Sequence, residues 1–206
     1  MRLSFFTCAV LAFTVSAAAQ DVRSVTSPDG NLVFRIFTAT QEGRELSRLA
    51  YQVDYKGKPA ITTSYLGLNL WEQEPLLGEN MGLIDTKSEP GHLVVKYMQN
   101  GSLARRLDVE IRVFNEGFAF RYTVGTSIAV PELLIDEEAT EVANVIPVHL
   151  GEKPKPGYSA IEWVHHKNLY LTKLPKRFDG HAPYTGPWRV VAFSDRARLQ
   201  ILNQLP

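Results

Sequence analysis

The residues best suited to chemistry lie near the end of the chain. Glu162, Trp163 and His165 stand between two proline-containing loops, and Trp188 and Arg189 open the last predicted strand. A large aromatic ring offers an apolar face to a C–H-rich ligand, and carboxylate, imidazole and guanidinium groups bond to hydroxyls. These five residues are therefore our candidate carbohydrate-binding residues. The alternative is that each tryptophan packs in the core or at its rim.

Two other chemistries were weighed for the acidic residues. Glycoside hydrolysis needs two carboxylates about 5–10 Å apart, and no pattern places two of Glu138, Glu141 and Glu162 in a common cleft. Calcium takes about six to eight oxygen ligands, of which 136–141 and Glu162 could supply some. The alternative interpretation of the acidic segment is a solvated turn.

The adjacent histidines offer little for a metal site. His165 and His166 would point to opposite faces of a strand, which makes it hard for them to share one metal ion. We therefore interpret them as ordinary surface or loop histidines.

Composition and the N-terminus bound the class of protein. The chain has 206 residues, is 45% hydrophobic and carries 22 basic and 22 acidic residues. A net charge of zero gives no electrostatic case for nucleic acid or an anionic membrane. Residues 1–19 have a basic start, a short apolar run and an Ala-Ala-Ala end, which predicts a cleaved signal peptide and a periplasmic or secreted protein. The only cysteine, Cys8, lies in that segment.

The middle of the chain holds the strongest secondary-structure pattern. From Leu107 to Val113 apolar residues alternate with charged ones, and after Asn115-Glu116-Gly117 the alternation resumes from Phe118 to Val124. Each run therefore predicts a strand with one buried face, and the short turn predicts a hairpin. We expect a positive φ at Gly117, and we expect this aromatic-rich hairpin to occupy the middle of the core.

Similar runs separated by turn residues fill most of the remaining chain. Their spacing of roughly 8–12 residues predicts an all-β antiparallel sandwich. The expected strands cover 22–26, 31–38, 49–55, 59–63, 66–70, 81–86, 93–98, 142–150 and 190–193. We expect loops at 72–80 and 174–184, and Ser194 can cap a short C-terminal helix over 196–205.

Several segments, taken in order, resemble the N-terminal domain of glycoside hydrolase family 97. The run Asn-Glu-Gly-Phe-Ala-Phe-Arg-Tyr that ends at Tyr122 is similar to the strongest signature of that domain. The acidic segment 137–141 resembles another of its motifs, and 185–191 resembles the strand that ends the domain. Weaker similarity lies in 27–32, 46–59, 65–68 and 203–206.

This resemblance implies a β-supersandwich of the galactose-mutarotase-like type over residues 20–206. In the family, the domain packs against a (β/α)8 barrel that hydrolyses α-glucosides or α-galactosides and carries the catalytic carboxylates. For this chain the resemblance implies a non-catalytic, carbohydrate-binding domain of bacterial type. Its implied ligands are α-linked gluco- or galacto-oligosaccharides, with calcium at Glu162 and Glu141.

Two departures from the family pattern shape our expectations. The chain stops where the barrel would begin, so we expect a domain truncated before the barrel, without catalytic residues of its own. The alternative is half of a split or decayed hydrolase that is active only with a barrel partner. The Tyr-Glu pair of the family would fall at Tyr158-Ser159, where the acid is absent, and the interval 158–188 is short. Glu162 is the nearest substitute for that acid.

Overall fold

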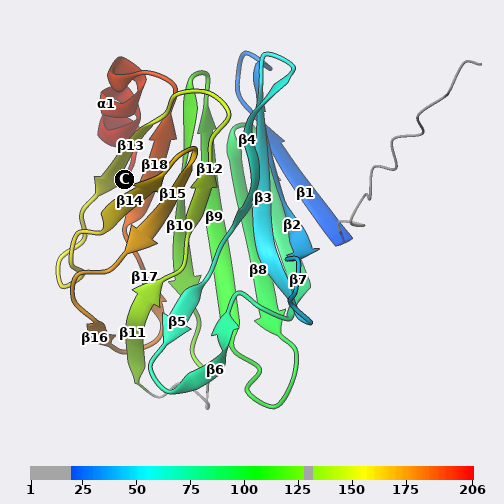
Figure 1. The fold of residues 1–206 in the computed structure, drawn as a ribbon, viewed down its shortest axis with the longest axis vertical. Coiled ribbons are helices and arrows are strands. Elements are labelled where there is room, and N and C mark those ends of the chain that lie inside the picture. Colours follow the sequence, from blue (N-terminus) through cyan, green and yellow to red (C-terminus); the bar gives the residue numbers. More distant parts are fainter. Residues whose placement is uncertain (1–19, 128–131) are drawn as a thin grey trace, which may run out of the picture.

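The computed structural model describes residues 20–127 and 132–206, so the predicted signal peptide lies outside the described residues. The chain folds as antiparallel sheets with a short C-terminal helix (Figure 1). The first ten strands are β1 Gln20–Thr26, β2 Leu32–Thr40, β3 Ser47–Tyr55, β4 Lys58–Tyr65, β5 Leu68–Leu70, β6 Gln73–Leu77, β7 Met81–Glu89, β8 His92–Gln99, β9 Arg106–Phe114 and β10 Gly117–Val124. The remaining elements are β11 Leu133–Glu138, β12 Glu141–Ala143, β13 His149–Lys153, β14 Glu162–His166, β15 Leu169–Lys173, β16 Phe178–Gly180, β17 Tyr184–Thr185, β18 Trp188–Ala192 and α1 Asp195–Gln204. The predicted all-β sandwich is confirmed.

The sheets follow a simple order. One layer is the sheet β13-β18-β10-β9-β8-β7, to which β17 is attached through β10. Facing it are β1-β2-β3-β4 and, toward the other end, β16-β11-β5-β6. A small sheet, β12-β15-β14, lies beside β13 and β18 in the view of Figure 1. The main core fills the space between the layers.

The hairpin of β9 and β10 occupies the middle of this core, as predicted. The two strands pair in unbroken register from Phe114–Gly117 to Leu107–Val124. The side chains of Phe118 and Phe120 are buried, and the Phe118 ring centroid lies 5.1 Å from that of Phe34 on β2. The hairpin therefore joins the two layers through aromatic contacts.

Gly117 differs from the expectation of a positive φ. It is not among the glycines with positive φ, and it is the first residue of β10. A Cβ atom at this position would lie 2.6 Å from the Val191 carbonyl oxygen and 2.8 Å from the Ala192 Cα. Glycine is therefore required here because the backbone of β18 approaches closely, and not because of the turn conformation.

Helix α1 covers the outer face of the larger sheet. Ser194 caps the helix, and its side chain accepts a hydrogen bond from the Ala197 N–H at 3.1 Å. Ala197 and Ile201, one turn apart, are buried against Trp188 and Val190 of β18. The outward face of β18 is consequently as buried as its inward face.

Three expected segments differ from the structure in detail. The predicted loop 72–80 contains β6, the predicted loop 174–184 contains β16, and the predicted strand 142–150 is split into β12 and β13. These short strands form by pairing with segments distant in sequence, which local alternation does not reveal. In the part of the chain that the structure describes, no helix is long and apolar enough to cross a membrane.

Candidate functional site

The largest polar centre in the interior is an ion pair between the two layers. Arg189 projects inward from β18, and Glu138 ends β11 on the opposite layer. The Arg189 Nε donates to Glu138 Oε1 at 2.8 Å, and Nη2 donates to Oε2. Both side chains are almost fully buried, at 1% and 2% exposure. A two-pronged guanidinium–carboxylate contact fixes both side chains, and so fixes β11 relative to β18.

Further groups complete the bonding of Glu138 and Arg189. The Tyr158 hydroxyl donates to Glu138 Oε2 at 3.1 Å, and the Thr140 hydroxyl donates to Oε1 at 3.3 Å. Glu152 on β13 places Oε1 3.2 Å from Arg189 Nη1. We call these five residues the buried ionic centre. It connects three strands and the loop that carries Tyr158.

Charge states follow from these contacts. Burial alone lowers the pKa of Arg189, but the facing carboxylates of Glu138 and Glu152 together raise it by more, so the guanidinium stays charged. Burial and the adjacent Glu138 charge raise the pKa of Tyr158 well above its usual range. Tyr158 therefore remains a neutral hydrogen-bond donor at physiological pH.

A small cavity lies beside the buried ionic centre. Its free volume is about 10 Å³, which is enough for about one water molecule and far too small for a sugar ring. The Tyr184 hydroxyl is buried near it without a hydrogen-bond partner, and burial raises the pKa of Tyr184 to about 12. The buried ionic centre is thus a positioning structure, not an open ligand site.

Trp188 and Arg189 therefore do not share a surface with the other candidate residues. Trp188 faces outward from β18 beneath α1 and is 2% exposed. The Arg121 guanidinium lies 4.4 Å from its ring centroid. Alternation along β18 sends Trp188 and Arg189 to opposite faces, and each face is covered. Their predicted contact with carbohydrate stays a prediction.

The remaining candidate residues lie together on β14, but on both of its faces. Trp163 and His165 share one face, and the His165 ring stacks on Tyr170 of β15 with centroids 4.1 Å apart. Trp163 is half-buried against the core, whereas His165 is exposed. Glu162 points to the opposite face, where its carboxylate lies 3.9 Å from Lys173 Nζ. We call Trp163, His165 and Tyr170 the hairpin aromatic row.

The two acids predicted as calcium ligands stand apart. Glu141 begins β12 and Glu162 begins β14, with β15 between them. The Glu141 carboxylate accepts a hydrogen bond from the Tyr65 N–H at 3.4 Å and lies 4.0 Å from Arg48. Within residues 20–127 and 132–206, no three His, Cys, Asp or Glu side chains form a metal-binding group. Glu141 and Glu162 alone do not fit calcium, which takes about six to eight oxygen ligands.

Sequence reasoning missed the role of Glu138. Strict alternation from Leu133 and Ile135 would send Glu137 inward, but the register of β11 against β5 shifts between Ile135 and Glu137. This bulge turns Glu138 into the core instead. The signal that could have found it is the buried arginine of the last strand, which requires a carboxylate partner.

Comparison with known proteins places the fold and the family. The family model described as "Glycosyl-hydrolase 97 N-terminal" matches residues 25–144, more than half of the chain. The chain belongs to this family. Comparison with curated protein sequences gave no match.

Solved structures of glycoside hydrolase family 97 enzymes share the fold. An enzyme of this family from Pseudoalteromonas sp. strain K8, in complex with acarbose, superposes with a TM-score of 0.70 and 17% identity, covering 84% of this chain and 36% of that one. The E480Q form of such an enzyme from the same strain, in complex with panose, gives 0.69 and 16%, with the same coverages. A β-arabinopyranosidase gives 0.67 and 17%, covering 85% and 40%. The chain spans little more than a third of the length of these relatives.

Proposed function

We propose that this protein is the carbohydrate-recognising, non-catalytic N-terminal domain of a family 97 α-glucosidase or α-galactosidase. The observation that carries the proposal is the family match over residues 25–144. Superposition on enzymes whose structures hold acarbose or panose supports an oligosaccharide ligand. The predicted signal peptide supports a periplasmic or secreted location in a bacterial cell.

We place ligand contact on the hairpin aromatic row. The stacked His165 and Tyr170 rings and the adjacent Trp163 offer apolar faces beside polar ring nitrogens. Contact between such faces and the C–H groups of a sugar buries apolar area in a fixed geometry. The buried ionic centre holds β11, β13 and β18 in place behind this hairpin.

A catalytic barrel as partner is a second proposal, favoured by one observation. This chain covers only 36% of the length of enzymes with the same fold, so two thirds of those enzymes has no counterpart here. Hydrolysis would then be carried out by a barrel chain that binds this domain. Activity toward α-glucosides only when the two chains are mixed would support it, and the absence of any gain on mixing would contradict it.

The test of the hairpin uses two neighbouring histidines. His165 lies on the hairpin aromatic row, and His166 is equally exposed but points to the opposite face. Calorimetric titration with maltotriose, panose and an α-linked galacto-oligosaccharide should show binding. His165→Ala should weaken it by about 2- to 10-fold, the value of one aromatic contact of roughly 0.5–1.5 kcal/mol. His166→Ala should leave binding unchanged.

The proposal names its own contrary results. Equal weakening by both histidine variants would remove the hairpin aromatic row as the site. No binding of any α-linked sugar by the unmodified protein would overturn carbohydrate recognition itself.

A further inference from the structure

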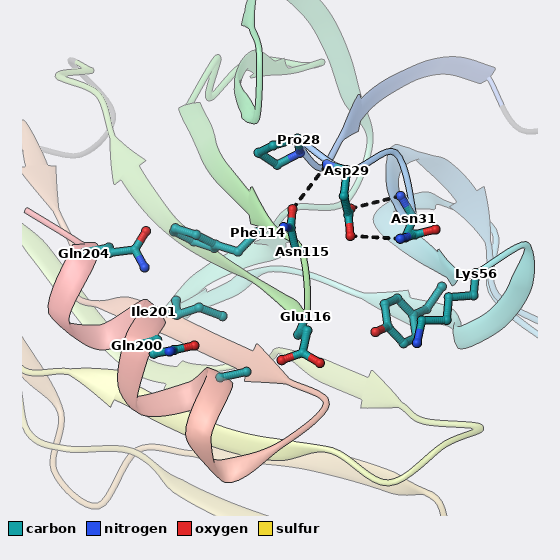
Figure 2. A pocket seen from close by; sticks show the side chains of 12 residues that line it. Pro28, Asp29, Asn31, Lys56, Phe114, Asn115, Glu116, Gln200, Ile201 and Gln204 are labelled. Carbon is teal, nitrogen blue, oxygen red and sulfur yellow. Dashed lines mark hydrogen bonds between the residues drawn. The ribbon is translucent and has the colours of Figure 1, made fainter.

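A cleft on another part of the surface carries a separate inference. It lies between α1 and three turns, namely those that join β1 to β2, β3 to β4 and β9 to β10 (Figure 2). Its volume is about 550 Å³, within the range of about 300–1,000 Å³ that is typical of ligand pockets. None of the candidate residues predicted from the sequence lines it.

One wall of the cleft is cross-linked and pre-formed. The Asp29 carboxylate accepts hydrogen bonds from Ser27 Oγ at 2.6 Å and from the Asn31 backbone N–H at 3.1 Å. The Asp29 N–H donates to Asn115 Oδ1 at 3.2 Å, which ties the first turn to the β9–β10 turn. The Lys56 N–H in turn donates to the Asn31 carbonyl at 2.7 Å. Three turns therefore hold one another in place before any ligand arrives.

The facing wall is helix α1. Figure 2 shows Gln200, Ile201 and Gln204 on this side, across from Phe114 and Glu116. Gln200 and Gln204 are four residues apart, so they lie one above the other on the same helix face. Ile201 between them packs into the core beneath α1 and fixes the orientation of that face.

The polar groups that remain free define the ligand. Asp29 is occupied by its own turn, and hydrogen bonds from Ser27 and Asn31 lower its pKa. The exposed side-chain amides of Gln200 and Gln204 can each donate and accept, and the Glu116 carboxylate can accept. Phe114 adds a half-buried aromatic surface.

This combination favours a neutral polyhydroxylated ligand. Two carboxylates face one ammonium group, that of Lys56, which disfavours an anion such as phosphate. Hydroxyl groups both donate and accept, which matches side-chain amides, and the C–H face of a sugar ring matches Phe114. We propose that the cleft between α1 and these turns is a second oligosaccharide-binding site, separate from the hairpin aromatic row. Its ligand class rests on the proposed function, whereas its position does not.

The experiment is an NMR titration of the uniformly ¹⁵N-labelled protein with maltotriose, and separately with inorganic phosphate. Maltotriose should cause saturable shifts of the side-chain amide signals of Gln200 and Gln204 and of the backbone signals of Asn115 and Glu116. The double variant Gln200→Ala/Gln204→Ala should weaken this response by about 5- to 10-fold, as expected for two lost hydrogen bonds. Asn203→Ala, an exposed change on α1 outside the cleft, should leave it unaltered.

Each other result has a definite meaning. Shifts confined to β14 and β15 would overturn the second site and leave the proposed function standing. Shifts caused by phosphate but not by maltotriose would overturn the ligand class of the cleft. No shift anywhere with maltotriose would overturn the cleft site, and testing the proposed function would then rest on panose and the galacto-oligosaccharide. Alanine favours helix, so the double variant is expected to fold.

Discussion

Glu138 is the residue on which Arg189, Tyr158 and Thr140 converge. A buried ion pair is not stabilising by virtue of its charges alone, because both ions lose hydration. Removal of one partner is the costly event, since the other charge then stays buried and unpaired. This asymmetry yields a prediction that distinguishes the buried ionic centre from ordinary surface pairs.

Arg189→Met should lower the free energy of unfolding by about 3–5 kcal/mol, because it leaves the Glu138 carboxylate buried without its cation. Adding Glu138→Leu to that variant should restore most of the loss, since an apolar pair of similar volume is close to neutral. Arg35→Met is the control, because its partner Asp54 and Arg35 itself are about a third exposed, and it should cost less than about 1 kcal/mol. Urea unfolding measures all three. A cost for Arg189→Met no larger than that of the control would contradict this account.

The charge on Glu141 gives a prediction about pH. Burial raises the pKa of Glu141, and Arg48 opposes that rise only in part. The folded state therefore holds the proton more tightly than the unfolded state, so this group destabilises the fold increasingly as the pH rises through its ordinary pKa and above. Glu141→Gln, which cannot ionise, should gain stability relative to the unmodified protein between about pH 4 and pH 7. Urea unfolding at several pH values measures the difference, and a difference that shrinks with rising pH would contradict the assignment.

At the scale of elements, the close approach of β10 and β18 depends on one glycine. Gly117→Ala would bring a Cβ against the backbone of Val191 and Ala192, which cannot move as a flexible side chain can. Overpacking of this kind costs about 1–3 kcal/mol. Gly186→Ala is the matched control, because the nearest atom to its Cβ lies 3.7 Å away. Thermal unfolding should show a lower midpoint for the first variant alone, and equal midpoints would show that β18 does not constrain Gly117.

The elements also show how far sequence reasoning reaches. The β9–β10 hairpin could be predicted because its alternation is local and unbroken from Leu107 to Val124. The burial of Trp188 could not, because α1 covers a face that alternation alone leaves open. The inward turn of Glu138 depends on a bulge against β5, a strand about 70 residues earlier in the chain. Pairing between distant segments therefore decided the candidate site, whereas local pattern decided most of the fold.

At the scale of the whole molecule, the domain presents two separate surfaces for oligosaccharides. The hairpin aromatic row lies on β14 and β15, and the cleft lies between α1 and the turns that join other strands. Both are built on the sandwich that places this chain in the glycosyl-hydrolase 97 N-terminal family. Because the sheets pair without gaps in one continuous core, we expect the domain to fold by itself and to unfold cooperatively.

Thermal unfolding of the protein, with and without α-linked gluco- and galacto-oligosaccharides, tests the central claim of carbohydrate recognition most directly. A sugar that binds only the folded state stabilises it by about 2.7 kcal/mol at a hundred times its dissociation constant. For a domain of this size we expect a cooperative transition and a rise in midpoint of about 5–10 °C, with no rise for a β-linked sugar of equal length. A cooperative transition that no α-linked sugar moves would contradict the account.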